Sequence, residues 1–247
     1  MSGQQRVLVY PADRLVEEAA RRLVAITRER IAATGRCTVA LSGGSTPGPV
    51  YQSLAASPLR DEVDWSRVYV FWGDERTVPP ESDQSNYRLA RETLLDHVPI
   101  PAGQIYRLRG EIDPEMAAAE YEQTIRRVFN LAPGELPVFD LLLQGIGPDG
   151  HTASLFPGTV ALHERERLVV ANVVPQLNTM RLTLTVPVIQ NAARIVVLVA
   201  GRDKAEAVRR ALEGEWNPEE TPSQILRQAR GEDDWLLDVD AASLLHR

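Results

Sequence analysis

Short apolar runs alternate with longer amphipathic segments along most of this chain. The run "RVLVY" at residues 6–10 is followed by residues 13–33, whose apolar positions recur at helical spacing and which Gly35 ends. The same alternation predicts strands at 37–44, 67–76, 138–147, 168–174, 180–186 and 194–201, and helices at 47–56, 82–98, 114–130 and 203–214. Strands that alternate with helices indicate an α/β fold with an open, largely parallel, Rossmann-like sheet flanked by helices.

The length of the chain suits one such sheet. Its 247 residues, of which 44% are hydrophobic, are enough to bury a substantial core. The sequence contains no internal repeat, no low-complexity tract and no evident linker, and the proline-containing stretches at 99–101 and 133–137 read as loops. We therefore expect residues 1–247 to form a single domain.

Charge and cysteine content narrow the possible partners and the compartment. The formal net charge of −7 gives no general attraction for nucleic acid or an anionic membrane, so we expect neither as a partner. The single cysteine, Cys37, suits a reducing cytoplasm. The apolar run near the start is too short for a signal peptide or a membrane span, so we expect a cytoplasmic protein. The sequence leaves the oligomeric state open.

Three loops that follow predicted strands carry unusual chemistry. They are "LSGGSTPG" at 41–48, "FWGDERTVP" at 71–79 and "GIGPDGHTASLFPG" at 145–158. In open parallel sheets, ligands bind beyond the carboxyl ends of the strands. We therefore expect these three loops to meet at one rim of the sheet and to form a functional site there.

The first loop has the features of a phosphate site. Two glycines allow close backbone approach, hydroxyls can donate hydrogen bonds, and a helix with Pro47 at its first position follows at once. Free amides at a helix N-terminus attract phosphate. The candidate residues are Ser42, Gly43, Gly44, Ser45 and Thr46. The alternative, equally open from this loop alone, is an ordinary turn in which Thr46 caps the helix.

The second loop places Asp74, Glu75 and Arg76 directly after a strand. Arg76 could contact phosphate oxygens or a carboxylate through its guanidinium fork. Asp74 or Glu75 could hold that arginine or a substrate hydroxyl, and we count Asp74 among the substrate-binding candidates. The alternative is a solvated surface turn.

The third loop contains G-x-G-x-x-G, the pattern of dinucleotide sites. Pro148 and Asp149 argue against that function, because x-Pro-Asp-Gly is a turn sequence and Asp149 would repel a pyrophosphate. His151 lies two residues after Asp149, so the carboxylate could fix the orientation and tautomer of the imidazole. Histidine is the usual general base near neutral pH. The alternative is a structural histidine that caps a short helix at 152–156.

Two further basic residues could reach the same rim. Arg181 opens "RLTLT" and Lys204 follows "VLVAGRD", so both are candidate phosphate contacts, with ordinary surface charge as the alternative. The chain has no G-x-S-x-G, so Ser154 and Ser45 are poor candidates for a nucleophile. Its four histidines lack metal-ligand spacing, and we predict no metal and no cofactor.

Together these motifs resemble those of the 6-phosphogluconolactonase family over nearly the whole chain. The matching segments are "LSGGSTP", "FWGDERTVP", "SDQSNYRLARETLL", "GIGPDGHTASLFPG", "MRLTLT" and "GRDKAEAV". The resemblance implies the open α/β sheet shared by lactonases, sugar-phosphate isomerases and amino-sugar-phosphate deaminases. It also implies hydrolysis of 6-phospho-D-glucono-1,5-lactone to 6-phospho-D-gluconate, the second step of the oxidative pentose phosphate pathway, with the sugar-phosphate lactone as the binding partner.

The resemblance also implies roles for individual residues. His151 would be the base that activates water, Asp149 its companion, and Arg76 a residue near the substrate. The implied phosphate-binding group consists of Ser42, Gly43, Gly44, Ser45, Thr46, Arg181 and Lys204.

The competing family is glucosamine-6-phosphate deaminase. That family is similar up to the histidine and then carries Phe-Asn-Glu, whose carboxylate serves ring opening. Here the corresponding places are Ser154, Leu155 and Phe156. The lactonase resemblance therefore fits the sequence better.

Overall fold

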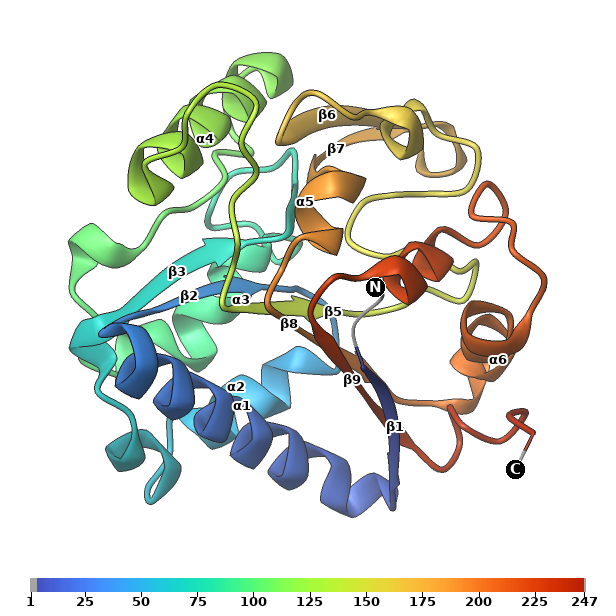
Figure 1. Ribbon diagram of the computed structural model, residues 1–247, viewed down its shortest axis with the longest axis horizontal. Coiled ribbons are helices and arrows are strands. Elements are labelled where there is room, and N and C mark those ends of the chain that lie inside the picture. The colour runs from blue at the N-terminus through green and yellow to red at the C-terminus, as the bar shows by residue number, and fades with distance from the viewer. Residues whose placement is uncertain (1–3, 247) are drawn as a thin grey trace.

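The computed structural model describes residues 4–246, which form two sheets with helices around them (Figure 1). The larger sheet has six strands in the order β1-β9-β8-β5-β2-β3, and every neighbouring pair is parallel. Its strands are β1 (Gln5–Tyr10), β2 (Cys37–Leu41), β3 (Val68–Trp72), β5 (Leu141–Gln144), β8 (Arg194–Val199) and β9 (Glu232–Asp238). The smaller sheet is antiparallel, in the order β4-β7-β6, and consists of β4 (Asp74–Arg76), β6 (Val169–Val174) and β7 (Thr179–Leu184).

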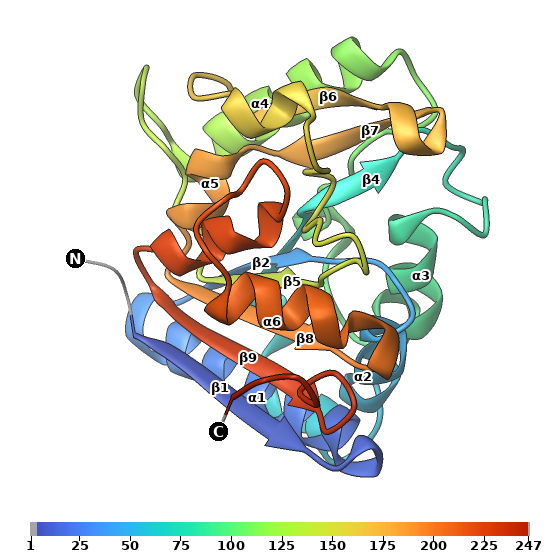
Figure 2. The same cartoon turned by 90° about the vertical axis from the view of Figure 1, so that its right-hand side faces the viewer.

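Helices cover the parallel sheet and extend to the smaller one. They are α1 (Ala12–Thr34), α2 (Pro47–Leu54), α3 (Asn86–Thr93), α4 (Pro114–Phe129), α5 (Val186–Gln190) and α6 (Ala205–Glu213). Helices α1 and α2 lie on one side of the parallel sheet, whereas the antiparallel sheet and α4 lie on the other (Figures 1 and 2). The predicted α/β fold with a largely parallel sheet is confirmed.

Burial follows from this layering. Every residue of β2 and of β5 is buried, as expected for central strands covered on both faces. The edge strand β1 instead alternates between exposed and half-buried residues. Helix α1 ends at Gly35 as predicted, since that glycine adopts the left-handed conformation and its N–H bonds to the carbonyl of Ile31.

The predicted strand at 67–76 is wrong in one respect, because it is two strands in different sheets. The N–H of Gly73 donates to the carbonyl of Leu41 in the parallel sheet, over 2.9 Å. Its carbonyl accepts from the N–H of Leu184 at the end of β7, also over 2.9 Å. Gly73 is therefore the point at which the chain passes from one sheet to the other, and β4 begins at the carboxyl end of β3.

Two predicted helices also need correction. The helix predicted at 82–98 is shorter, since α3 ends at Thr93 and a 3₁₀ turn, Leu95–His97, follows. Residues 152–156 form no helix but a turn with a bridge between Thr152 and Leu155. Histidine 151 therefore has no helix to cap, and the G-x-G-x-x-G segment lacks the helix that a dinucleotide site needs.

Candidate active site

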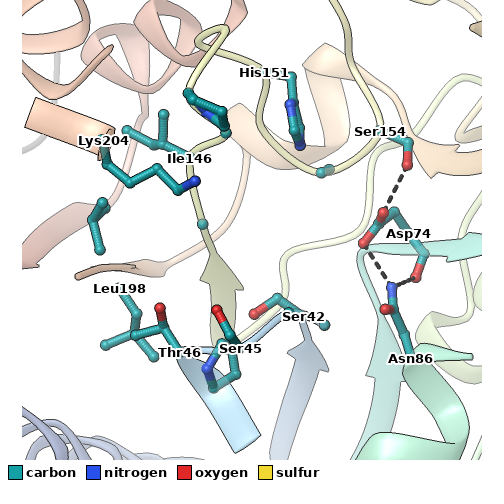
Figure 3. A pocket seen from close by; sticks show the side chains of 18 of the residues that line it. Ser42, Ser45, Thr46, Asp74, Asn86, Ile146, His151, Ser154, Leu198 and Lys204 are labelled. Atoms are coloured by element: carbon teal, nitrogen blue, oxygen red, sulfur yellow. Dashed lines mark hydrogen bonds between the residues drawn. The ribbon is translucent and has the colours of Figure 1, made fainter. Parts of the chain in front are cut away.

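A cavity of about 290 Å³ opens at the carboxyl ends of β2, β5 and β8 (Figure 3). Residues from all three predicted loops line it, together with side chains from β4, β7 and the β8–α6 turn. Of the candidate residues, Ser42, Gly43, Gly44, Ser45, Thr46, Asp74, Arg76, His151, Arg181 and Lys204 line the cavity. Asp149 does not line it and lies behind His151 instead.

The loop before α2 presents unused hydroxyls to the cavity. Thr46 occupies the N-cap position of α2, yet its side chain makes no capping hydrogen bond, so the alternative of an ordinary Thr46 cap is wrong. Ser45 and Thr46 lie together at one side of the cavity (Figure 3). Ser42 is held from behind by the buried hydroxyl of Tyr51, which donates to its carbonyl over 2.7 Å. Backbone and hydroxyl groups thus converge at the N-terminus of α2, an arrangement that suits an anion.

Lys204 approaches the same side of the cavity from the β8–α6 turn (Figure 3). Its Nζ lies 2.7 Å from Oδ2 of Asp203, and its side chain is 25% exposed. The turn is fixed by Asp238, whose carboxylate accepts the N–H of Gly201 over 2.9 Å and that of Ala241 over 2.7 Å. The ammonium group of Lys204 therefore lines the same side of the cavity as the start of α2.

Asp74 lies at the other side of the cavity within a buried network. Its carboxylate accepts from the hydroxyl of Ser154 over 2.7 Å and from Nδ2 of Asn86 over 3.1 Å (Figure 3). A side chain at position 43 would place its Cβ 1.7 Å from Oδ1 of Asn86, so only glycine fits there. The sequence predicted neither Asn86 as a site residue nor Ser154 as a partner of Asp74. No local spacing signals these contacts, because they join residues 12 and 80 positions apart.

Glu75 faces away from the cavity and fixes the start of α3. Its carboxylate accepts from the backbone N–H groups of Arg76, Asn86 and Tyr87, each over 2.8 Å, and from the hydroxyl of Ser85. Burial raises the pKa of Glu75, and these hydrogen bonds act in the opposite direction. The alternative in which Glu75 holds Arg76 or a substrate hydroxyl is therefore wrong, because its oxygens are already engaged.

Arg76 and Arg181 lie side by side on neighbouring strands of the antiparallel sheet. They are register partners in β4 and β7, and both line the cavity. Arg76 donates from Nη1 to the carbonyl of Gln84 over 2.5 Å. Burial lowers the pKa of Arg181, and the charge of Arg76 lowers it further.

His151 is oriented by three neighbours. Its Nδ1 lies 2.6 Å from Oδ1 of Asp149, which also accepts the His151 N–H over 3.1 Å. Its ring stacks on Phe156, with centroids 4.1 Å apart and planes 23° apart. A Cβ at Gly147 would lie 2.1 Å from the imidazole, so the glycine leaves room for the ring. Phe156, which the sequence suggested only as a difference from deaminases, therefore belongs to the site.

The contact with His151 also lowers the pKa of the Asp149 carboxyl group. Burial acts to raise the pKa of Asp149, but the hydrogen bond from His151 and the charge of that residue outweigh burial, and the pKa is lowered. An ionised carboxylate that accepts from Nδ1 leaves Nε2 as the nitrogen that can take a proton. Within residues 4–246, Nε2 has no hydrogen-bond partner.

Residues 4–246 bring no three His, Cys, Asp or Glu side chains together in a group that could hold a metal ion. No helix among these residues has both the length and the apolar character to cross a bilayer.

The parallel sheet, its rim cavity and the histidine–carboxylate pair define an α/β enzyme with a site for a small anionic ligand. Residues 11–235 match the family described as glucosamine-6-phosphate isomerases/6-phosphogluconolactonase. The chain belongs to this family, which confirms the resemblance seen in the sequence.

Relatives and solved structures are similar over nearly the whole chain. The chain is 43% identical to a 6-phosphogluconolactonase of Synechocystis sp., covering 94% of each protein, and 39% identical to one of Mycobacterium bovis, covering 96% of this chain and 97% of that one. The structure of a 6-phosphogluconolactonase from Trypanosoma cruzi has a TM-score of 0.86 at 30% identity and covers 100% of this chain and 99% of that chain. A monomeric glucosamine-6-phosphate deaminase, 23% identical with a TM-score of 0.79, shares the fold.

Proposed function

We propose that this chain hydrolyses 6-phospho-D-glucono-1,5-lactone to 6-phospho-D-gluconate, the second step of the oxidative pentose phosphate pathway. The relatives named as 6-phosphogluconolactonases support this reaction. The observation that carries it is the Asp149–His151 pair, with the free Nε2 of an imidazole that lines a cavity whose other side suits an anion. We further propose that residues 1–247 form one catalytic domain that works in the cytoplasm on a small-molecule substrate without a cofactor.

The mechanism begins with water activation at His151. Nε2 takes a proton from water as the water oxygen attacks the lactone carbonyl carbon, and the carbonyl oxygen becomes an oxyanion. Ionised Asp149 stabilises the imidazolium formed in this step. Arg76 and backbone amides stabilise the oxyanion. When the bond from the carbonyl carbon to the ring oxygen breaks, the imidazolium returns its proton to that oxygen, and the open-chain acid leaves.

The phosphate group is assigned to the opposite side of the cavity. Backbone amides of residues 42–46, the hydroxyls of Ser45 and Thr46, and the ammonium of Lys204 supply donors and positive charge there. Asp74 would accept a hydrogen bond from a sugar hydroxyl between the two sides, because its carboxylate is fixed and lines the cavity. Arg181, which the sequence groups with the phosphate contacts, lies opposite Arg76 in the antiparallel sheet and is not assigned to this group.

The deaminase alternative is disfavoured by what surrounds His151. Where that family has a carboxylate for ring opening, this chain has Phe156, whose ring stacks on the imidazole. Ser154, in the first of the three differing places, donates to Asp74. The histidine therefore has Asp149 as its acidic partner and an apolar ring where a deaminase needs its glutamate.

The test is an assay of the purified chain on two substrates. With freshly prepared 6-phosphogluconolactone, we expect acid release and 6-phosphogluconate formation well above the spontaneous rate. With glucosamine 6-phosphate, we expect no release of ammonia. Ammonia release without lactone hydrolysis would overturn the proposal in favour of the deaminase, and tight binding of 6-phosphogluconate with no turnover of either substrate would overturn it in favour of a binding protein.

A further inference from the structure

The antiparallel sheet holds two guanidinium groups on the same face, and the acids near them, Asp74 and Glu75, form no salt bridge with either group within the described residues. Arg76 in β4 and Arg181 in β7 are directly opposite in register, and side chains of such partners project from the same face of a sheet. Like charges opposite each other destabilise a sheet. Within residues 4–246, neither guanidinium lies within ion-pair distance of a carboxylate.

The nearby acids are engaged elsewhere. The carboxylate of Asp74 accepts from Ser154 and Asn86, and that of Glu75 accepts from the start of α3. Nε of Arg181 is buried and has no hydrogen-bond partner in the described chain. Such groups are costly to leave unsatisfied. The pair of guanidinium groups therefore has the charge and the unused donors of an anion site.

This pair lies on the side of the cavity that holds Asp74 and His151, which we call the reacting side. Asp74 and Arg76 are two positions apart in β4 and so share one face of the strand. Asp74 is tied to the His151 loop through Ser154, and Figure 3 shows His151 and Asp74 on one side with Thr46 and Lys204 on the other. The charge of the Arg76–Arg181 pair is thus separate from that of Lys204.

We propose that Arg76 and Arg181 together bind the oxygens at C1 of the substrate, so that Arg181 acts on the lactone and on the product carboxylate and not on the phosphate. This inference rests on the proposed function. As water attacks and its proton passes to His151, the carbonyl oxygen gains negative charge between the two guanidinium groups. When the ring C–O bond breaks and the ring oxygen receives that proton, a carboxylic acid remains at C1. It loses its own proton to solvent water, and the carboxylate that results keeps both contacts.

The first test uses two lactones and two charge-matched variants. In Arg181→Met, kcat/KM should fall about 100-fold, as for loss of one oxyanion donor, on both 6-phosphogluconolactone and unphosphorylated glucono-1,5-lactone. The control Arg202→Met removes an exposed positive charge beside Lys204, from a residue that does not line the cavity, and should leave both rates unchanged. A loss confined to the phosphorylated lactone, or no loss, would overturn the inference.

The second test measures binding without turnover. We expect the wild type to bind 6-phosphogluconate about 10-fold or more tightly than glucitol 6-phosphate, in which CH₂OH replaces the carboxylate. Arg181→Met should abolish this preference, whereas Lys204→Met should weaken both ligands equally and keep it. If Arg181→Met weakens both ligands equally, Arg181 binds phosphate and the inference is wrong.

A replacement variant and the wild-type rates distinguish failure of this inference from misfolding and from failure of the proposed function. If Arg181→Met does not fold, as judged by thermal melting, Arg181→Lys replaces it, because lysine keeps the charge but not the planar fork. Equal losses on both lactones support the inference, and a loss on the phosphorylated lactone alone refutes it. A wild type that hydrolyses neither lactone refutes the proposed function, while the carboxylate preference still tests the Arg76–Arg181 pair.

Discussion

The two sides of the cavity are built differently. At the reacting side, Asp74 and Arg181 project from strands of the antiparallel sheet, and the turn that carries His151 is tied to Asp74 by a buried hydrogen bond from Ser154. At the opposite side, Ser45, Thr46 and Lys204 lie on turns, and within residues 4–246 no hydrogen bond uses the side chain of Ser45 or Thr46. Groups that stabilise a transition state benefit from rigid placement, whereas a phosphate can be held by several donors of a loop. The reacting side is therefore suited to the chemical step, and the opposite side is suited to binding the phosphate.

The largest effect should come from removing the base at the reacting side. We expect His151→Ala to lower kcat/KM about 10²- to 10⁴-fold, and by the same factor on phosphorylated and unphosphorylated lactone, because the base acts on water and not on phosphate. Initial rates corrected for spontaneous hydrolysis measure this. The control is His163→Ala, since His163 also pairs with a carboxylate, at 3.0 Å from Glu219, but does not line the cavity. Wild-type rates in His151→Ala would remove His151 from the mechanism.

A smaller and more selective effect should come from the opposite side. Lys204→Met should raise KM for the phosphorylated lactone about 10- to 100-fold, since a hydrogen bond to a charged group is worth about 1.5–3 kcal/mol. The rate on the unphosphorylated lactone should stay unchanged. Equal losses on both lactones would show that Lys204 does not recognise the phosphate. Catalysis and phosphate binding would then not be separated between the two sides of the cavity.

The smallest effect should come from Thr46→Val. We expect KM for the phosphorylated lactone to rise about 3- to 10-fold, with stability changed by no more than about 0.5 kcal/mol, because the Thr46 hydroxyl makes no capping bond. Ser85→Ala is the matched control for stability. The hydroxyl of Ser85 accepts the N–H of Arg88 over 3.1 Å and caps α3, so its loss should cost about 0.5–2 kcal/mol.

Thermal and denaturant unfolding of both variants checks this prediction. A loss of stability in Thr46→Val as large as in Ser85→Ala would mean that Thr46 serves as a cap and that its hydroxyl is not free for a ligand.

Much of this arrangement follows from patterns within short stretches of sequence. Strand–helix alternation predicts the parallel sheet, and the position of loops after strands predicts which segments meet at its rim. The adjacency of Asp149 and His151 predicts their contact because two residues of a turn cannot lie far apart. These inferences need only local geometry and one general rule of sheet topology.

Contacts between distant segments could not be predicted in this way. The bond from Ser154 to Asp74 and the packing of Asn86 against Gly43 depend on how the two sheets are placed relative to each other. The passage of the chain between sheets at Gly73 has no signal in hydrophobic periodicity, because both strands continue the same apolar-to-charged run. For the same reason, the sequence could not show that Asp74 faces the cavity and Glu75 faces α3. The antiparallel sheet determines which way each side chain projects.

The passage at Gly73 also limits how this segment can change its length. Successive residues of β4 project to opposite sides, so one inserted residue after Gly73 would exchange the two sides. Glu75 would then enter the cavity, while Asp74 and Arg76 would turn toward α3. A substitution alters one side chain of this segment, whereas a one-residue insertion would at once replace Arg76 by Glu75 on the cavity face and remove the Glu75 carboxylate from the start of α3.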